Sequence, residues 1–316
     1  MSAPAVAPAA AVPPPLQGEV PSPGRELVRA LAEAPDGSAE VALDLPVTLT
    51  TTFPFFATRP RYTVRHLLGT RPVEDGADRA TYVIEPVRAD TPAESGTSYD
   101  ASPEAAFEPV LAEARLTDVR VTVPLPAGLV ERPDLLAAHI DRRVVVRLCT
   151  AENEMLLHGS ADGAVPGLLK ARGLRTARGR GRIADDVAWA AAMVEETGGS
   201  CDGIVVHPDV YWALALDGRL AHLNAAGVRV SRTRMIARHQ ALFADFRAVA
   251  TLLDPASSRL VLRRGGSNGN GNGNGNGSSG SSGSRGADVV EASCRVGLAV
   301  HLPQHLVLVD LGEAPQ

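Results

Sequence analysis

The sequence predicts an α+β protein, and three features of its pattern support that prediction. Residues 81–88 and 116–123 are typical of strands and could pair as a long hairpin arm. Residues 133–157 carry one apolar stripe at helical spacing. The rest of the chain mixes both types: we expect helices over 183–197 and from residue 208, and strands over 203–206, 228–233, 241–246, 248–253, 259–263, 289–301 and 305–311.

The predicted long helix starts at Pro133, a residue favoured at the first helical position. At 1.5 Å per residue, the helix would be roughly 35 to 40 Å long. The β-branched run at 144–146 leaves a strand open as the alternative for that part. The apolar stripe of the helix consists of Leu136, Ile140, Val144, Leu148, Ala151 and Met155.

The beginning of the chain has a different composition. Residues 1–24 are rich in alanine and proline, and we expect a flexible arm because they cannot bury enough side chain to offset the entropy of ordering. Leu27 and Leu31 then lie on the apolar face of a short amphipathic helix predicted over 25–34. Between two later predicted strands, residues 265–286 form a Gly/Asn/Ser insertion that we expect to be disordered.

The composition argues against several classes of protein. A net charge of -5 does not suit a protein whose main role is to coat nucleic acid. The three cysteines are far apart in the sequence, so we expect neither a disulfide framework nor a zinc site, and a reducing cytoplasm fits best. Neither a secretory signal nor an apolar run of about 18 residues is present, so we expect no membrane partner.

The sequence offers weak candidates for catalysis. Cys201, His207 and Asp209 are residue types that can form a catalytic nucleophile set. Cys201 and His207, however, would be about 20 Å apart along an extended strand. We therefore expect a buried thiol and a helix-capping imidazole. Acidic neighbours on the predicted helices point in different directions and are expected on solvated faces or as caps: Glu152 with Glu154, and Asp185 with Asp186. No motif for binding phosphate or activating a nucleophile occurs, so we expect no enzyme, cofactor or metal.

Charged residues form one acidic and one basic cluster. The acidic cluster lies between the two predicted arm strands and comprises Asp90, Glu94, Asp100, Glu104 and Glu108. The basic cluster lies in a predicted loop and comprises Lys170, Arg172, Arg175, Arg178, Arg180 and Arg182. Three interpretations of the basic cluster remain open: a solvated loop, a nucleic-acid contact, or a salt-dependent contact with the acidic arm of a neighbouring subunit.

Several segments resemble the tailed-phage major capsid proteins. Residues 152–174 (ENEMLLHGSADGAVPGLLKARGL) resemble the end of that family's long spine helix and the glycine-rich turn after it. GIVVHPDVYWALAL at 203–216 is similar to its strand, Asn/His-Pro and helix element, and ALFADF at 241–246 to its Gly-Asp-Phe strand, with Ala244 in place of glycine. CRVGLAVHLPQHLVLVDL at 294–311 is similar to its final strands. The resemblance implies the Hong Kong ninety-seven-like fold, which has a P-domain, an A-domain and an extended E-loop.

The resemblance also implies boundaries for these parts. The flexible N-terminal arm with its short amphipathic helix would span 1–45, and the E-loop 76–118. The P-domain would comprise 46–75, then 119–158 with the spine helix, and then the 256–303 hairpin with its insertion. The A-domain would comprise 159–255 together with a final strand and tail at 304–316.

Within this group the chain is most similar to the encapsulins. Few residues precede the hairpin, and the E-loop contains no lysine for a covalent cross-link. The resemblance implies a self-assembling icosahedral shell of roughly sixty copies around a cargo enzyme in the bacterial cytoplasm. It also implies a pore lined by Arg219, His222 and Asn224, and cargo docking on Leu27 and Leu31. A tailed-phage or prophage major capsid protein is the first alternative, and a cytoplasmic enzyme or small-ligand binder is the second.

Overall fold

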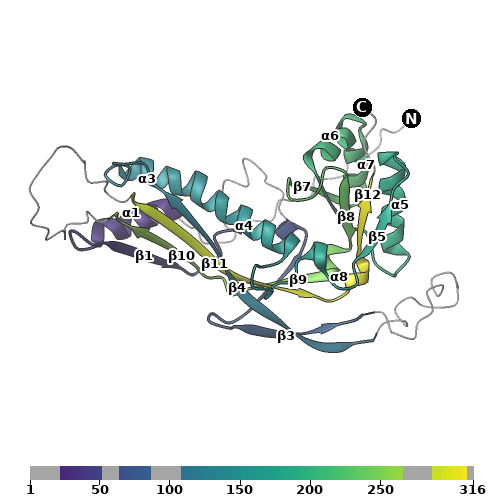
Figure 1. The fold of residues 1–316 in the computed structure, drawn as a ribbon, viewed down its shortest axis with the longest axis horizontal. Coiled ribbons are helices and arrows are strands. Elements are labelled where there is room, and N and C mark those ends of the chain that lie inside the picture. Colours follow the sequence, from purple (N-terminus) through teal and green to yellow (C-terminus); the bar gives the residue numbers. More distant parts are fainter. Residues whose placement is uncertain (1–21, 52–63, 87–107, 266–286, 312–316) are drawn as a thin grey trace, which may run out of the picture.

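The computed structural model describes residues 22–51, 64–86, 108–265 and 287–311. These residues form two β-sheets, and one long helix runs along the larger sheet toward the smaller one (Figure 1). The predicted α+β class is confirmed. The acidic residues Asp90, Glu94, Asp100 and Glu104, most of the predicted N-terminal arm and nearly all of the Gly/Asn/Ser insertion lie outside the described residues.

The larger sheet is organised around one long strand, β11 (Val289–Val300). Residues 289–294 of β11 pair with β10 (Ser258–Arg263), and β10 pairs on its other side with β1 (Glu40–Leu45). On its opposite edge, β11 pairs with the second half of β4 (Val110–Pro124). The last residues of β11 pair with β9 (Ala250–Asp254), which in turn pairs with β2 (Gly69–Pro72). The late strand β11 therefore holds the larger sheet together.

The predicted long helix is confirmed, with an irregularity at its centre. It comprises α3 (Pro133–His139), a π-helical turn over Ile140–Val144 and α4 (Val145–His158). A π turn inserts one extra residue, which shifts the buried face of the helix by one position. The buried residues accordingly pass from Ile140 and Val144 to Val145 and Leu148. The β-branched run is therefore helical and packs on the sheet.

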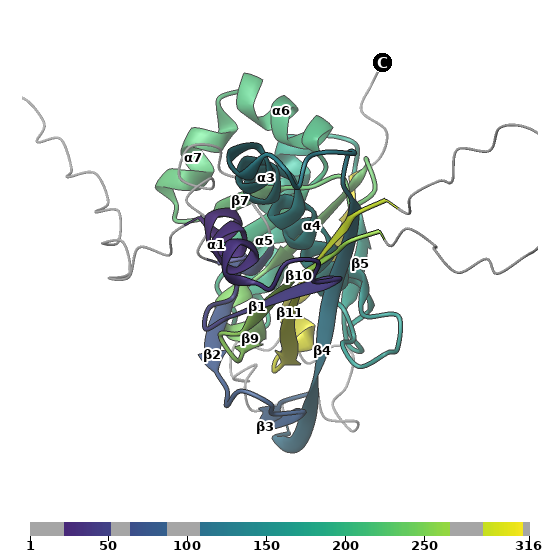
Figure 2. The same cartoon turned by 90° about the vertical axis from the view of Figure 1, so that its left-hand side faces the viewer.

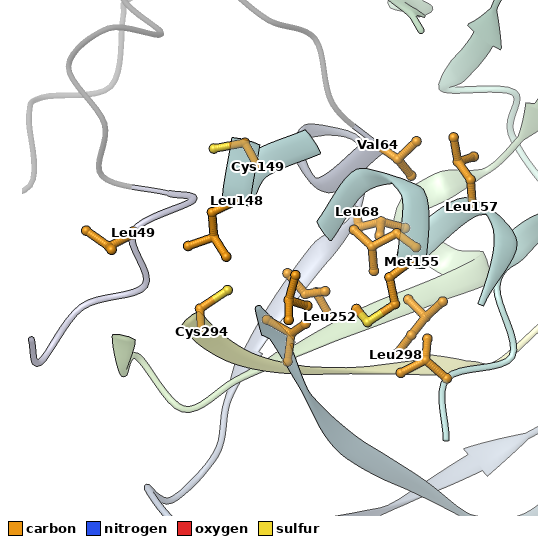
Figure 3. Packing of buried hydrophobic residues seen from close by; sticks show 14 of the residues in the cluster. Leu49, Val64, Leu68, Leu148, Cys149, Met155, Leu157, Leu252, Cys294 and Leu298 are labelled. Atoms are coloured by element: carbon orange, nitrogen blue, oxygen red, sulfur yellow. The ribbon is translucent and has the colours of Figure 1, made fainter. Parts of the chain in front are cut away.

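The main core lies between this helix and the larger sheet. Leu148 of α4 points toward Cys294 of β11, while Met155 lies near Leu252 and Leu298 (Figure 3). Alternating residues of β4 and β11 supply the floor of this core, as the pleat of a half-buried sheet requires. The core fixes the position of the helix along the sheet.

The helix α1 (Pro23–Glu33) packs closely on α3 (Figure 2). A Cβ atom on Gly24 would overlap the backbone carbonyl of Ala137, so glycine permits the close approach. Ser22 Oγ donates to the Asp141 carboxylate, and Gly24 N donates to Asp141 Oδ1 at 2.8 Å. The short helix predicted over 25–34 is confirmed, at residues 23–33, and it is docked on the subunit; residues 40–45 of the predicted 1–45 arm form the edge strand β1.

The two-stranded arm has a different register from the one predicted. β3 (Arg79–Ile84) pairs with residues 110–115, the first half of β4. Residues 116–123, which were expected in the arm, instead pair with β11 in the larger sheet. Their side chains Leu116, Val119 and Val123 are buried there, and that burial accounts for the placement.

The smaller sheet has the order β5 (Arg175–Arg178), β12 (Leu306–Asp310), β8 (Gln240–Ala244), β6 (Gly203–Val206) and β7 (Arg229–Arg232). Three helices accompany it: α5 (Ile183–Glu195), α6 (Pro208–Leu216) and α7 (Arg219–Ala225). Apolar residues of α5 and α6 form a second core with strands β6, β8 and β12. A short helix, α8 (Phe246–Val249), leads from β8 into β9 of the larger sheet.

Candidate assembly surfaces

Large apolar side chains that remain exposed gather at three places among the described residues. They are Val83, Val110 and Leu111 on the arm, Leu135 on α3, and Trp212 and Leu216 on α6. Leu111 is 75% exposed and Leu216 is 87% exposed. Grouped apolar side chains at protruding positions are typical of surfaces that another molecule covers.

The arm is fixed firmly at its base. Glu85 N donates to the carbonyl of His301 at 2.8 Å, and Gln304 Nε2 donates to the carbonyl of Glu85 at 2.8 Å. The His301 ring also meets the edge of the Tyr82 ring, with 5.4 Å between ring centres, and burial raises the pKa of Tyr82. Beyond this base, two strands alone give little stability in water. The arm therefore needs a second surface to lie on.

The arm keeps apolar groups on its exposed side. Val83 lies opposite Leu111 in the register of the two strands, and both side chains are exposed. Glu108, the one predicted acidic E-loop residue that the structure describes, is exposed beside the start of β4.

The predicted basic loop is in part a strand, which corrects its interpretation as one cluster. Arg175 and Arg178 lie in β5, which pairs in parallel with β12. Arg175 is half-buried and donates to the carbonyls of Gln304 at 2.7 Å and Met193 at 2.6 Å. Burial lowers the pKa of Arg175, against the opposing effect of Glu196. The Arg175 guanidinium is thus hydrogen-bonded within its own subunit and is not available to a partner.

The other cations of the segment remain at the surface. Arg182 forms an exposed ion pair of 3.0 Å with Asp185. The remaining four are exposed, and the structure records no ion pair between them and the described residues: Lys170, Arg172, Arg178 and Arg180. These four are therefore the candidates for contact with an acidic partner.

The predicted pore residues lie on a helix. Arg219, His222 and Asn224 belong to α7, a short helix that the sequence analysis did not predict, and all three are exposed. Gly218 in the left-handed conformation, with φ of 71°, makes that turn between α6 and α7. Arg219 and His222 also line a small cavity between α7 and α5.

The predicted cargo-docking residues differ in exposure. Leu27 is fully buried in the main core, between α1 and the long helix, and cannot contact a partner while α1 is docked. Leu31 is partly buried at the edge of the same core. The expectation for Leu27 is therefore corrected, and Leu31 alone stays accessible.

A buried ionic cluster, which the sequence did not predict, joins three distant segments. Arg65 Nη2 and Nε donate to Glu152 of α4 at 2.9 and 3.1 Å, and Arg65 Nη1 donates to Asp254 Oδ2 at 2.9 Å. Arg65 is 4% exposed and Glu152 is 1% exposed. Burial alone would lower the pKa of Arg65, but the two carboxylates outweigh it and hold the pKa above its ordinary value.

Hydroxyl groups complete the ionic cluster. Thr50 Oγ1 donates to Glu152 Oε1 at 2.9 Å, and Thr48 Oγ1 donates to Asp254. Such a cluster is stable only as a complete set, because removing one charge leaves its partner buried and unpaired. Glu152 is therefore not on a solvated face as expected. Its position one turn after Leu148, on the buried side of the helix, was the available signal.

Cys201 and His207 have structural roles, in agreement with the sequence analysis. Cys201 is buried, and burial raises its pKa to about 12. His207 caps α6: its Nδ1 accepts a hydrogen bond from Asp209 N at 3.2 Å. Asp185 is exposed. Asp186 is buried, and its carboxylate accepts hydrogen bonds from Arg180 N and Gly181 N, so it caps the loop before α5.

The three thiols should be unreactive in the folded protein. Cys149, Cys201 and Cys294 are all buried, and burial also raises the pKa of Cys294 well above its usual range. A thiolate-selective disulfide reagent at pH 8 is expected to modify none of them quickly, and all three after denaturation in guanidinium. Rapid release of a chromophore from the native protein would contradict this burial.

No group of three or more His, Cys, Asp or Glu side chains among the described residues could hold a metal ion. No helix among the same residues is long and apolar enough to cross a membrane.

Comparison with known proteins places the fold. No protein-family model and no curated protein sequence matches the chain. Solved structures do match over most of the length. A virus-like particle from Pyrococcus furiosus aligns with a TM-score of 0.52 and 10% identity, covering 82% of this chain and 97% of that one. The capsid of a native GTA particle aligns with a TM-score of 0.52 and 17% identity, covering 81% and 98%.

A structure of Mycobacterium phage Adephagia aligns with a TM-score of 0.50 and 16% identity, covering 81% of this chain and 91% of that one. The chain therefore has the tailed-phage capsid fold of the Hong Kong ninety-seven type, as its sequence resemblance implied. The structures that it resembles are subunits of multi-copy particles.

Proposed function

We propose that the chain is the self-assembling subunit of an encapsulin nanocompartment, an icosahedral shell that encloses a cargo enzyme in the bacterial cytoplasm. The protruding β3–β4 arm carries this proposal, because it presents apolar side chains that its own subunit leaves uncovered. In a closed shell each copy offers the same surface to the next, so every arm is covered. The resemblance to a virus-like particle supports this architecture.

The parts of the subunit would have the following roles. The larger sheet and the long helix form the P-domain, the smaller sheet with α5, α6 and α7 forms the A-domain, and β3 with the start of β4 forms the E-loop. Arg219, His222 and Asn224 of α7 line a pore. Leu31, at the accessible edge of α1, contributes to cargo docking, while Leu27 holds α1 in place.

Charge would assist the contact between copies. The acidic E-loop residues, of which Glu108 is described, meet the four exposed cations of a neighbour: Lys170, Arg172, Arg178 and Arg180. Exposed charge pairs are screened by salt, so this contribution weakens as ionic strength rises. Nucleic acid is not a required partner in this scheme.

A tailed-phage or prophage major capsid protein is the second candidate. The fold is similar to a GTA capsid and to a mycobacteriophage structure, and this similarity supports a phage capsid protein. It is as strong as the fold similarity that supports the encapsulin. The two differ in what assembly requires and in what the particle encloses. An enzyme or small-ligand binder is the third candidate, and its activity would survive in a monomer.

Assembly of the chain alone is the deciding experiment. We expect uniform hollow particles by size-exclusion chromatography and negative-stain electron microscopy after expression without any other gene. Particle yield should fall as sodium chloride is raised during reassembly. A scaffold or protease requirement would favour the phage candidate, and a stable monomer under all conditions would refute a shell.

A further inference from the structure

One face of α6 exposes a tryptophan to solvent. Asp209, Trp212 and Leu216 follow one another at spacings of three and four residues, so they lie on the same face of the helix. Trp212 is 56% exposed and Leu216 is 87% exposed. Val210 and Leu214, on the opposite face, are buried in the second core. The described part of the chain therefore leaves the outer face of α6 uncovered.

Two arginines flank this outer face. The Arg232 guanidinium lies over the Tyr211 and Trp212 rings, 4.5 and 5.2 Å from their centres. At the first turn of the helix, the exposed Arg238 places its Nε 3.7 Å from Asp209 Oδ2. The two guanidinium groups outnumber the one carboxylate on this face. The face therefore suits an occupant that combines an apolar ring with an acidic side chain.

The chain beyond Leu311 starts close to this face. Leu311 N donates to the His239 carbonyl at 2.7 Å, and His239 directly follows Arg238 in the sequence. A segment that continues from Leu311 therefore starts beside the Arg238 end of the outer face of α6.

Trp212 is also within reach of that segment. Val206 of β6 and Val309 of β12 both lie opposite Ala241 of β8, so the two strands end at the same edge of the sheet, about 10 Å apart. Trp212 lies four residues from the start of α6, about 6 Å along the helix. These lengths place Trp212 roughly 10 to 15 Å from Leu311, a distance that about four extended residues can span.

The sequence that follows Leu311 carries its side chains in the matching order. It is GEAPQ, with Glu313 two residues and Pro315 four residues beyond Leu311. At extended spacing, Glu313 lies about 7 Å along the segment, at the Arg238 end of the face, and Pro315 lies about 13 Å along it, near Trp212. A carboxylate can pair with the exposed guanidinium, and surface aromatic rings are a common docking site for segments that contain proline.

We propose that residues 312–316 dock on the outer face of α6 in their own subunit, with the Glu313 carboxylate on Arg238 and the Pro315 ring on Trp212. The short connection to Leu311 keeps the local concentration of the segment high, which favours docking within one subunit. Salt screens the Glu313 contact, so ionic strength sets how often Trp212 is accessible to other molecules. This inference concerns a single subunit and goes beyond the proposed shell function.

The fluorescence of Trp212 tests the contact directly. The chain has two tryptophans, so Trp189→Phe leaves Trp212 as the only indole. Gln316→Cys then accepts a nitroxide label, while the native thiols are buried. A nitroxide quenches an indole only at short range, and we expect the label to quench Trp212 in unassembled subunits and in particles alike. The matched control carries the label at Leu135→Cys on α3, at the opposite end of the long helix from the smaller domain (Figure 1), and should leave the emission unchanged.

Charge reversal in the labelled chain tests the ionic half of the contact. Glu313→Arg should lower the ratio of docked to free segment about two- to fivefold, as the loss of one exposed ion pair predicts, and so reduce the quenching. Arg238→Glu should have the same effect, and combining the two reversals should restore the quenching. Glu131→Arg is the control, because Glu131 is exposed in the turn before α3 and should leave the quenching unchanged.

The outcomes separate this contact from the shell function. Quenching no stronger than that of the control label, or quenching that Glu313→Arg leaves unchanged, would overturn the docking. Quenching that appears only after assembly would place residues 312–316 on a second copy and would overturn docking within one subunit. Failure of the unmodified chain to form particles would overturn the shell function alone, because the contact is measured on unassembled subunits as well.

Discussion

Replacing Glu152 by alanine is expected to destabilise the subunit by about 3–5 kcal/mol. Glu152 accepts hydrogen bonds from Arg65 Nε, Arg65 Nη2 and Thr50 Oγ1, all inside the core. Its removal leaves the Arg65 guanidinium buried with Asp254 as its remaining carboxylate partner. Unfolding in urea, followed by circular dichroism, should show a large fall in the midpoint or a failure to accumulate folded protein.

The adjacent acid Glu154 provides the matched control. It lies on the same helix but is exposed, and Glu154→Ala should change the free energy of unfolding by less than about 0.5 kcal/mol. The double variant Arg65→Met with Glu152→Leu removes both charges of the main pair. Its loss of unfolding free energy should be smaller than the sum of the two single losses, because each single change leaves the other charge buried without its partner. Additive losses would show that the two residues are not coupled.

Gly24→Ala should release α1 from the long helix. The added Cβ would meet the backbone carbonyl of Ala137, and backbone cannot rotate aside as a side chain can. Forced overpacking of this kind costs about 1–3 kcal/mol, and here it also disrupts the Gly24 N hydrogen bond to Asp141. Trypsin should then cut at Arg25 and Arg29 on the order of tenfold faster, as the undocked population grows.

Gly69→Ala is the control for this change. Gly69 lies in β2, where an added Cβ would come no closer than 4.0 Å to Arg247 O and no positive φ is needed. It should leave trypsin cleavage near α1 unchanged. Equal cleavage rates for Gly24→Ala and the unmodified chain would show that α1 tolerates a wider separation from α3.

Elements with a strong local pattern could be predicted from the sequence. The long helix, α5, α6 and strands β6 to β12 lie close to their expected positions because each carries its own apolar period or proline signal. β1, β2 and β5 were missed because they are short strands whose existence depends on partners far along the chain. α7 was missed because a seven-residue helix with no fully buried side chain has a weak pattern.

The functional surfaces were harder to predict for the same reason. Glu152 and Arg65 are 87 residues apart, and no local rule indicates that one neutralises the other. Arg175 appeared to belong to a surface cluster until pairing with β12 turned it toward Gln304. Leu27 was correctly placed on an apolar helix face, but that face packs on its own subunit. Periodicity identifies an apolar face and says nothing about which molecule covers it.

The order of the strands has a consequence for synthesis of the chain. β11 lies between β10 and β4 in one sheet, and β12 lies between β5 and β8 in the other, yet both follow every other described strand in sequence. A growing chain on the ribosome therefore lacks one internal strand of each sheet until both have been translated. Native pairing must wait for these late segments, and long-range pairing of this kind is slow. In the proposed shell, half-made subunits would consequently present no finished surface to one another, and assembly would begin only after β12 has been translated.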